Sequence, residues 1–428
     1  MSVMTDIRPA LPAPARFAVP AGLGFLIGAS FLVPIGTRAG VTLGHVVLVA
    51  LLPVTLTASW KLRTTRYLFG AEALWLITSV VTDYLHGVGL HDSYLTFVRP
   101  VAIFVTYCGF LWLFKMGRRH VVAGVGGFFC GVIVSSATYQ AGNFALDPWK
   151  YGVGDPVTLA LVGCAGWALL RHRTALATEL VGVALMTNLL LGFRSEMGVV
   201  LVAAAVAGVA GTRRARDHRW AIKLGLLVAV VLAVGYPLYG ALASSGHLGV
   251  EQQYKWERQS QVTGGALIGA RPEFVSASII ISQSPILGRG TGFSVDLGTQ
   301  ARFLERLNQL GITVGPDQTQ FFFGQGVYLH SCIFQTWAES GILSLPAMLL
   351  PWALLLRAAG RAVRVGSRPM ALIFAVLAAQ FTWDLLFSPW PRLAPSMLGV
   401  ATAGAVVYLS RTRPEPVERA VPAVPVLT

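Results

Sequence analysis

The sequence is poor in charged residues, and poorest in acidic ones. Of its 428 residues only 12% are charged, about half the share usual in soluble domains, while 54% are hydrophobic. Asp and Glu together number 19, against 33 Lys and Arg. No soluble core needs so much apolar sequence, so a soluble enzyme is excluded as the main architecture.

Cysteine and metal-binding patterns are scarce as well. Four cysteines in 428 residues make no disulfide framework, and none lies in a C-x-x-C pair. The chain has no D-x-D motif, no two adjacent acidic residues and no His/Cys cluster with metal-ligand spacing. No Walker A motif is present. The sequence therefore predicts no bound metal and no cofactor.

Long apolar runs, by contrast, recur along almost the whole chain, which excludes a single anchor or a cleaved signal peptide as the explanation. A transmembrane helix needs about 20 mostly apolar residues. The sequence predicts an all-α integral membrane protein with about twelve transmembrane helices. They are expected at 17–36, 41–59, 67–83, 100–116, 121–140, 157–170, 176–192, 197–212, 221–244, 332–356, 369–387 and 393–410.

The basic residues indicate how these helices are oriented. Twelve spans place both termini on one side, and the tails and connections of that side carry 22 Lys or Arg against five in the short connections opposite. Because basic residues collect on the cytoplasmic side, both termini are predicted to be cytoplasmic. The spread of these charges over many helix ends also argues against binding of nucleic acid.

The chain accordingly divides into five predicted parts. These are a cytoplasmic tail (1–16), nine transmembrane helices (17–244), a large external loop (245–331), three more transmembrane helices (332–410) and a disordered cytoplasmic tail (411–428). A long ordered loop is usually functional. Within it an amphipathic stripe is suited to lying on the membrane or on the helix bundle. Its residues are Phe303, Leu304, Leu307 and Leu310.

Three arginines of the external side are candidates for binding an anion. Arg194 lies in a tight turn between two predicted spans, where it is either an interfacial residue or a clamp for phosphate oxygens. Arg271 precedes a predicted helix whose N–H groups could add to its charge. Arg289 lies in the glycine-rich stretch 288–292, for which a plain turn is the simpler interpretation.

His330 is the candidate proton acceptor. It lies where the loop re-enters the membrane, next to a helix that carries Glu339 among its first polar residues. An ordinary interfacial histidine is an equally open interpretation. Asp384 is an intramembrane carboxylate near the outer end of its span, and it could orient His330 or Arg194 or carry protons.

Taken in order, these features resemble the superfamily of O-antigen ligases and Wzy-type O-antigen (exopolysaccharide) polymerases. The resemblance rests on Arg194-Ser195 between two spans, on Arg271 and the turn 285–292 in the loop, and on His330 opening a helix that runs to Glu339-Ser340-Gly341-Ile342. It covers about residues 176–356 in detail and the remainder by topology. The family's common His-Asn pair is here His330-Ser331.

The resemblance implies a GT-C-like membrane glycosyltransferase of the bacterial inner membrane, with its active site on the periplasmic side. Such proteins transfer a glycan from undecaprenyl pyrophosphate to a sugar hydroxyl, without a metal. His330 is then expected as the catalytic base, and Arg194, Arg271 and Arg289 as pyrophosphate ligands. Glu339 and Asp384 are expected in supporting roles.

Two alternatives stay open. The acceptor is either another lipid-linked glycan, as in a polymerase, or lipid A–core, as in a ligase, and the divergent segment after Gly292 favours a polymerase. The rival of another class is a polytopic transporter or flippase of a lipid-linked solute. The chain shows no two related halves, and Asp384 alone offers few buried carboxylates for a pump.

Overall fold

The computed structural model describes residues 20–35, 40–138, 147–210, 237–247, 249–263, 271–312, 329–390 and 394–411, and these segments are helical without a β-strand. The first half comprises α1 (Ala21–Ala29), η1 (Ser30–Leu32), α2 (Leu43–Ala50), α3 (Leu52–Ser59), α4 (Arg63–Leu85), α5 (Leu90–Met116), α6 (Arg118–Thr138), the π-helical η2 (Trp149–Val153), α8 (Gly154–Leu170), α9 (Thr174–Leu190) and α10 (Arg194–Val209). The second half comprises α12 (Val250–Ser260), α14 (Glu273–Gln283), α15 (Leu297–Gln309), α17 (Cys332–Ser340), η4 (Ile342–Ser344), α18 (Pro346–Val365), α19 (Arg368–Phe387) and α20 (Ala394–Arg411).

Six of the described helices are long and apolar enough to cross a membrane, so the class of a multi-pass membrane protein is confirmed. They span Arg63–Leu85, Thr96–Met116, Arg118–Thr138, Trp149–Leu170, Ile342–Val365 and Arg368–Phe387. Two shorter apolar helices, Ala21–Leu32 and Thr174–Leu190, accompany them. The predicted number of twelve is not confirmed. Residues 221–236 of the ninth predicted span lie outside the described residues, as do both predicted tails apart from Arg411.

Two predicted spans are interrupted. The expected span 41–59 forms two eight-residue helices, α2 and α3, because Pro53 in the first turn of α3 has no N–H to continue the ladder. The expected span 332–356 breaks at Gly341, which has a φ of +77°. A Cβ there would lie 1.9 Å from the carbonyl oxygen of Ile286, so only glycine fits. The apolar helix therefore begins at Ile342, and α17 is a separate short helix.

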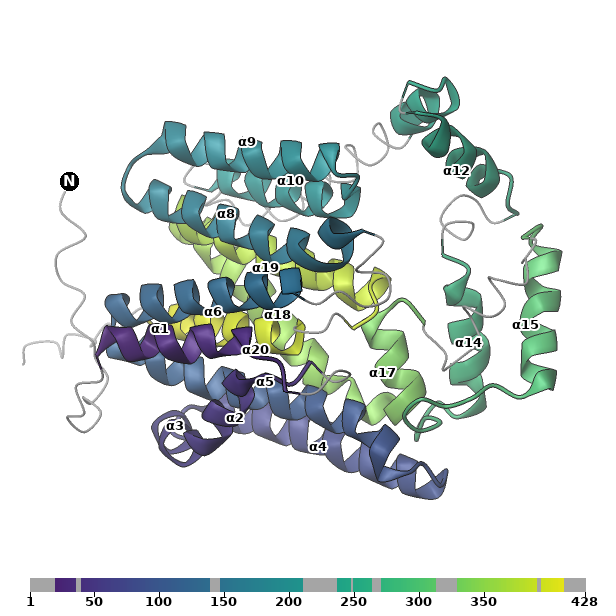
Figure 1. Cartoon of the computed structure of the whole chain (residues 1–428), viewed down its shortest axis with the longest axis horizontal. Coiled ribbons are helices and arrows are strands. Elements are labelled where there is room, and N and C mark those ends of the chain that lie inside the picture. The colour runs from purple at the N-terminus through teal and green to yellow at the C-terminus, as the bar shows by residue number, and fades with distance from the viewer. Residues whose placement is uncertain are drawn as a thin grey trace, which may run out of the picture.

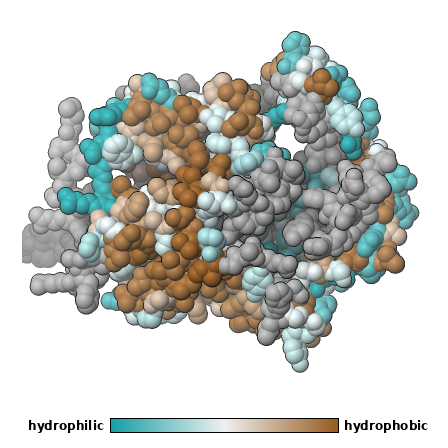
Figure 2. Space-filling model, viewed as in Figure 1, coloured by the Kyte–Doolittle hydropathy of each residue, from teal (hydrophilic) through white to brown (hydrophobic). Residues whose placement is uncertain are grey.

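The long helices pack side by side into one bundle, and α12, α14 and α15 of the predicted loop lie beyond one of its ends (Figure 1). Apolar surface dominates over the bundle, whereas much of the surface over α12 and α15 is hydrophilic (Figure 2). The contrast matches a bundle that faces lipid and a loop region that faces water.

At several helix ends, basic side chains donate hydrogen bonds to backbone carbonyls of neighbouring helices. Lys115 at the end of α5 donates to the carbonyl of Ala58 at 2.8 Å, and Arg411 at the end of α20 donates to that of Phe114 at 3.3 Å. Arg368, which begins α19, donates to a carbonyl at the end of α10. These contacts join the end of α5 to those of α3 and α20, and the start of α19 to the end of α10.

Candidate functional site

The candidate site lies where the first turn of α14 meets the residues before α17. Pro272 precedes α14 with a φ of −61°, which suits a helix start, and the chain enters the helix at Glu273. The ring of Phe274 lies 5.7 Å from that of Phe334 in α17 and 5.8 Å from that of Phe387 in α19. These aromatic contacts fix the N-terminus of α14 against two helices of the bundle.

His330 and Glu273 form the central pair of the site. Nδ1 of His330 lies 3.4 Å from Oε1 of Glu273, and the two side chains are 21% and 10% exposed. Glu273 Oε2 is buried and accepts no hydrogen bond from the described residues. Burial raises the pKa of Glu273, while the nearby charge of Arg271 opposes the shift. Arg271, Glu273 and His330 therefore form one electrostatic unit.

The backbone around His330 is held on both sides. Its φ is +43°, a left-handed conformation that non-glycine residues seldom adopt without support. Before it, the N–H of Leu329 donates to Gln335 Oε1 at 2.9 Å. After it, the Ser331 hydroxyl donates to the carbonyl of Leu385 at 2.7 Å and caps α17 by accepting from the N–H of Phe334. The imidazole is thus carried by a fixed, strained turn.

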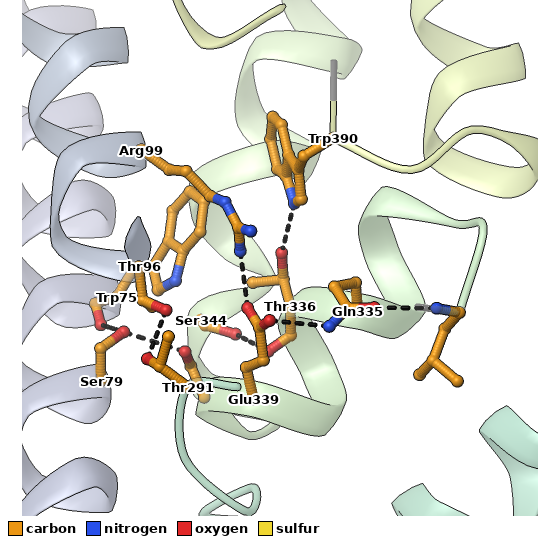
Figure 3. A network of polar contacts seen from close by, with 12 residues as sticks. Trp75, Ser79, Thr96, Arg99, Thr291, Gln335, Thr336, Glu339, Ser344 and Trp390 are labelled. Atoms are coloured by element: carbon orange, nitrogen blue, oxygen red, sulfur yellow. Dashed lines mark hydrogen bonds and ion pairs between the residues drawn. The ribbon is translucent and has the colours of Figure 1, made fainter. Parts of the chain in front are cut away.

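A buried polar network extends from this turn into the bundle (Figure 3). Arg99 of α5 pairs with Glu339 Oε2 at 2.6 Å, and its guanidinium lies 5.7 Å from the Trp390 ring. The other Glu339 oxygen accepts from Gln335 Nε2 at 2.7 Å, and Gln335 is the residue that holds Leu329. Glu339 therefore contacts His330 only indirectly: it positions Gln335, which in turn holds the backbone of Leu329 next to His330.

Arg289 does not reach the pair. Its side chain contacts Gln283 at the last turn of α14 and lies over the Phe293 ring, 5.9 Å from its centroid. Glu273 begins the same eleven-residue helix, and a rise of 1.5 Å per residue separates its two ends by about 15 Å. The predicted pyrophosphate ligand Arg289 is therefore placed away from Arg271 and His330.

The glycine-rich turn around Arg289 instead serves packing. The N–H groups of Arg289 and Gly290 donate to the carbonyls of Ala338 and Glu339, at 2.8 and 2.9 Å. Asp83 of α4 accepts from the N–H and the hydroxyl of Thr291 at 2.6 and 2.9 Å. The turn thus ties α17 to α4, in agreement with the simpler interpretation of this stretch.

Arg194 begins α10 and faces Tyr239, to which it donates a hydrogen bond and over whose ring its guanidinium lies at 5.3 Å. Two residues on, Glu196 is 1% exposed. Asp384 is close enough to influence the charge of Glu196 and that of Cys332, the first residue of α17. Arg194 belongs to the same end of the bundle as His330.

Asp384 belongs to a separate acidic cluster. Gln380 Nε2 donates to both of its oxygens at 3.3 Å, and its carboxyl interacts with those of Asp155 in α8 and Glu196 in α10. The carboxylate beside His330 is Glu273, not Asp384.

Sequence reasoning missed several of these residues. Glu273 and Arg99 were visible only as a helix-start acid and an outer-side base. Asp155 precedes a proline and Glu196 follows Arg194 by two residues, and neither belongs to a motif. The available signal for all four was the rarity of ionisable residues next to apolar helices.

No protein-family model matches the chain, and no curated protein sequence matches it. No group of three or more His, Cys, Asp or Glu within the described segments has the arrangement of a metal site.

Proposed function

We propose that the chain is a glycosyltransferase of cell-surface polysaccharide assembly that acts on an undecaprenyl-pyrophosphate-linked glycan. The observation that carries the proposal is the His330–Glu273 pair at 3.4 Å beside Arg271, at a helix N-terminus. The site combines a base, a carboxylate that orients it and a cation, which are the groups that such a transfer needs. The ordered resemblance to O-antigen ligases and Wzy-type polymerases supports the same assignment.

The reaction would be a single displacement. The acceptor hydroxyl attacks the anomeric carbon, the bond from that carbon to the pyrophosphate oxygen breaks, and the hydroxyl proton passes to His330. Because Nδ1 of His330 faces Glu273, we assign Nε2 as the atom that accepts the proton of the acceptor hydroxyl. One displacement inverts the anomeric centre. Arg271 and the first N–H groups of α14 would stabilise the charge that grows on the leaving pyrophosphate.

The cellular setting belongs to the same proposal. The enzyme would lie in the bacterial inner membrane with its termini in the cytoplasm and the α14–α17 site outside. Its acceptor would be a second lipid-linked glycan, as in a polymerase, or lipid A–core, as in a ligase. Membrane lipids would surround the apolar bundle.

The test separates binding from turnover in detergent, with a lipid-linked donor and without ATP or an ion gradient. His330→Ala should lower turnover by about 10²–10⁴, the range typical of a general base, while donor binding stays near that of the wild type. Arg271→Ala should reduce both, and Arg271→Lys should rescue it poorly because an ammonium lacks the guanidinium fork. Arg258→Ala, at an exposed position of α12, is the matched control. Full activity of His330→Ala would remove the base from the scheme.

A second candidate function has its own supporting observation. The carboxyls of Asp155, Glu196 and Asp384 interact inside the bundle, and the buried amide oxygen of Gln380 beside them has no hydrogen-bond partner in the described part of the chain. Such clusters are typical of proton-coupled transporters. Solute movement in sealed vesicles that requires a pH gradient and is lost in Glu196→Gln would favour that alternative. Transfer activity in detergent would favour the enzyme.

A further inference from the structure

A solvent-facing trough lies between α14 and α15, in the region beyond the end of the bundle (Figure 1). Its volume of about 580 Å³ falls within the range of small-molecule sites, roughly 300–1,000 Å³. The α14 wall is apolar and includes Phe274 and Ile279. The α15 wall is charged and presents Arg302, Glu305 and Arg306.

The way in which α15 packs explains why its charges face the trough. The predicted amphipathic stripe lies on protein, since Phe303 and Leu307 are 1% and 0% exposed and pack with Val275 and Ile279 of α14. Asp296 caps the helix by accepting from the N–H and the hydroxyl of Thr299, contacts that also hold the pKa of Asp296 below its ordinary value. The helix therefore has a fixed N-terminus and a fixed apolar face.

The two arginines of the trough keep much of their hydrogen-bonding capacity. Arg302 donates to the carbonyl of Gly298 and the hydroxyl of Thr299, and Arg306 donates to Gln309. A guanidinium has five N–H donors, so each retains donors for a ligand. Within the described segments neither arginine forms an ion pair. A ligand with carboxylates would complement this wall.

The position of the trough connects it to the candidate site. Its α14 wall begins at Phe274, the residue that follows Glu273, so the trough reaches the same end of α14 as Arg271 and His330. A molecule with an apolar ring face can lie on Phe274 while its polar edge meets Arg302 and Arg306. Sugars have both kinds of surface.

The geometry points to a glycan-binding trough that selects acidic sugars, with carboxylates held by Arg302 and Arg306 and a ring face held by Phe274. This inference rests on the proposed function in taking a glycan as the ligand. It adds the substrate class, a glycan with carboxylate groups, and the subsite that recognises it.

The test measures binding of two defined probes, tetragalacturonate and the neutral maltotetraose, to the purified full-length protein by calorimetry. Tetragalacturonate should bind at least about tenfold more tightly, because charge-assisted hydrogen bonds are the stronger ones. The double variant Arg302→Gln, Arg306→Gln should lose this preference, and the double lysine variant should recover part of it. Arg258→Gln, an exposed arginine of α12, should behave as the wild type.

Equal binding of the two sugars, or unchanged binding by the double glutamine variant, would overturn the inference. So would binding of phosphatidylglycerol vesicles, lost in that variant, without binding of tetragalacturonate, because the ligand would then be a lipid headgroup. The assay contains no donor, so its outcome is independent of transfer. A protein that binds tetragalacturonate yet never transfers a glycan would refute the proposed function alone.

Discussion

Replacing Glu273 by glutamine tests the pair at the centre of the proposed mechanism. The substitution keeps the shape of the side chain but removes the negative charge 3.4 Å from His330 Nδ1. That distance is longer than an ordinary hydrogen bond, and such contacts often tighten only when the reaction proceeds. The carboxylate then stabilises the imidazolium that forms as His330 takes the proton.

The expected size of the effect follows from this contact. A hydrogen bond to a charged group contributes about 1.5–3 kcal/mol, and about 1.4 kcal/mol corresponds to a tenfold change in rate. Turnover of Glu273→Gln should therefore fall by about 10- to 150-fold, with donor binding little changed. Glu257→Gln, an exposed glutamate of α12, should keep full activity. A Glu273→Gln enzyme within about twofold of the wild type would refute the role of the pair.

Glu273→Gln should raise the stability of the folded protein although it lowers turnover. Because burial raises the pKa of Glu273, its ionised form costs free energy in the folded state. The cost is absent below the ordinary pKa of glutamate, develops as the pH rises from that value to the raised one, and is constant above it. Thermal unfolding in detergent should therefore show wild-type stability falling across this window, and a flatter profile for Glu273→Gln. An unfolded variant at every pH would indicate a structural role instead.

Three further predictions concern the remaining features. Arg99→Met should destabilise the protein by about 3–5 kcal/mol, because it leaves the buried Glu339 carboxylate without its partner. In thermal unfolding, the double variant Arg99→Met, Glu339→Gln should recover much of this loss. A double variant as unstable as Arg99→Met alone would contradict the prediction. In a background without native cysteines, an impermeant thiol reagent should label Asn308→Cys but not Arg364→Cys in intact cells, and the reverse pattern would invert the proposed orientation. EDTA should leave the transfer rate unchanged. A loss of activity that magnesium restores would show that a metal ion, and not the arginines, stabilises the leaving pyrophosphate.

The membrane class and most individual helices followed from the sequence alone. The predicted spans 67–83, 121–140 and 369–387 correspond to α4, α6 and α19 within a few residues. Helix formation there depends on a local apolar run, which a sequence displays directly. The stripe on α15 was likewise predictable, although its partner was not, since amphipathic spacing identifies an apolar face but does not identify the surface that covers it.

The breaks and pairings depended on tertiary structure. Gly341 ends α17 because the chain near Ile286, 55 residues earlier, approaches too closely for any side chain. His330 meets Glu273 rather than Asp384 because α14 folds back onto α17, whereas Asp384 interacts electrostatically with Asp155 and Glu196 inside the bundle. The sequence determined which residues were chemically capable, since composition and periodicity are local properties. Only the packing of distant helices decided which of them meet, because the distances between such side chains are not encoded in their spacing along the chain.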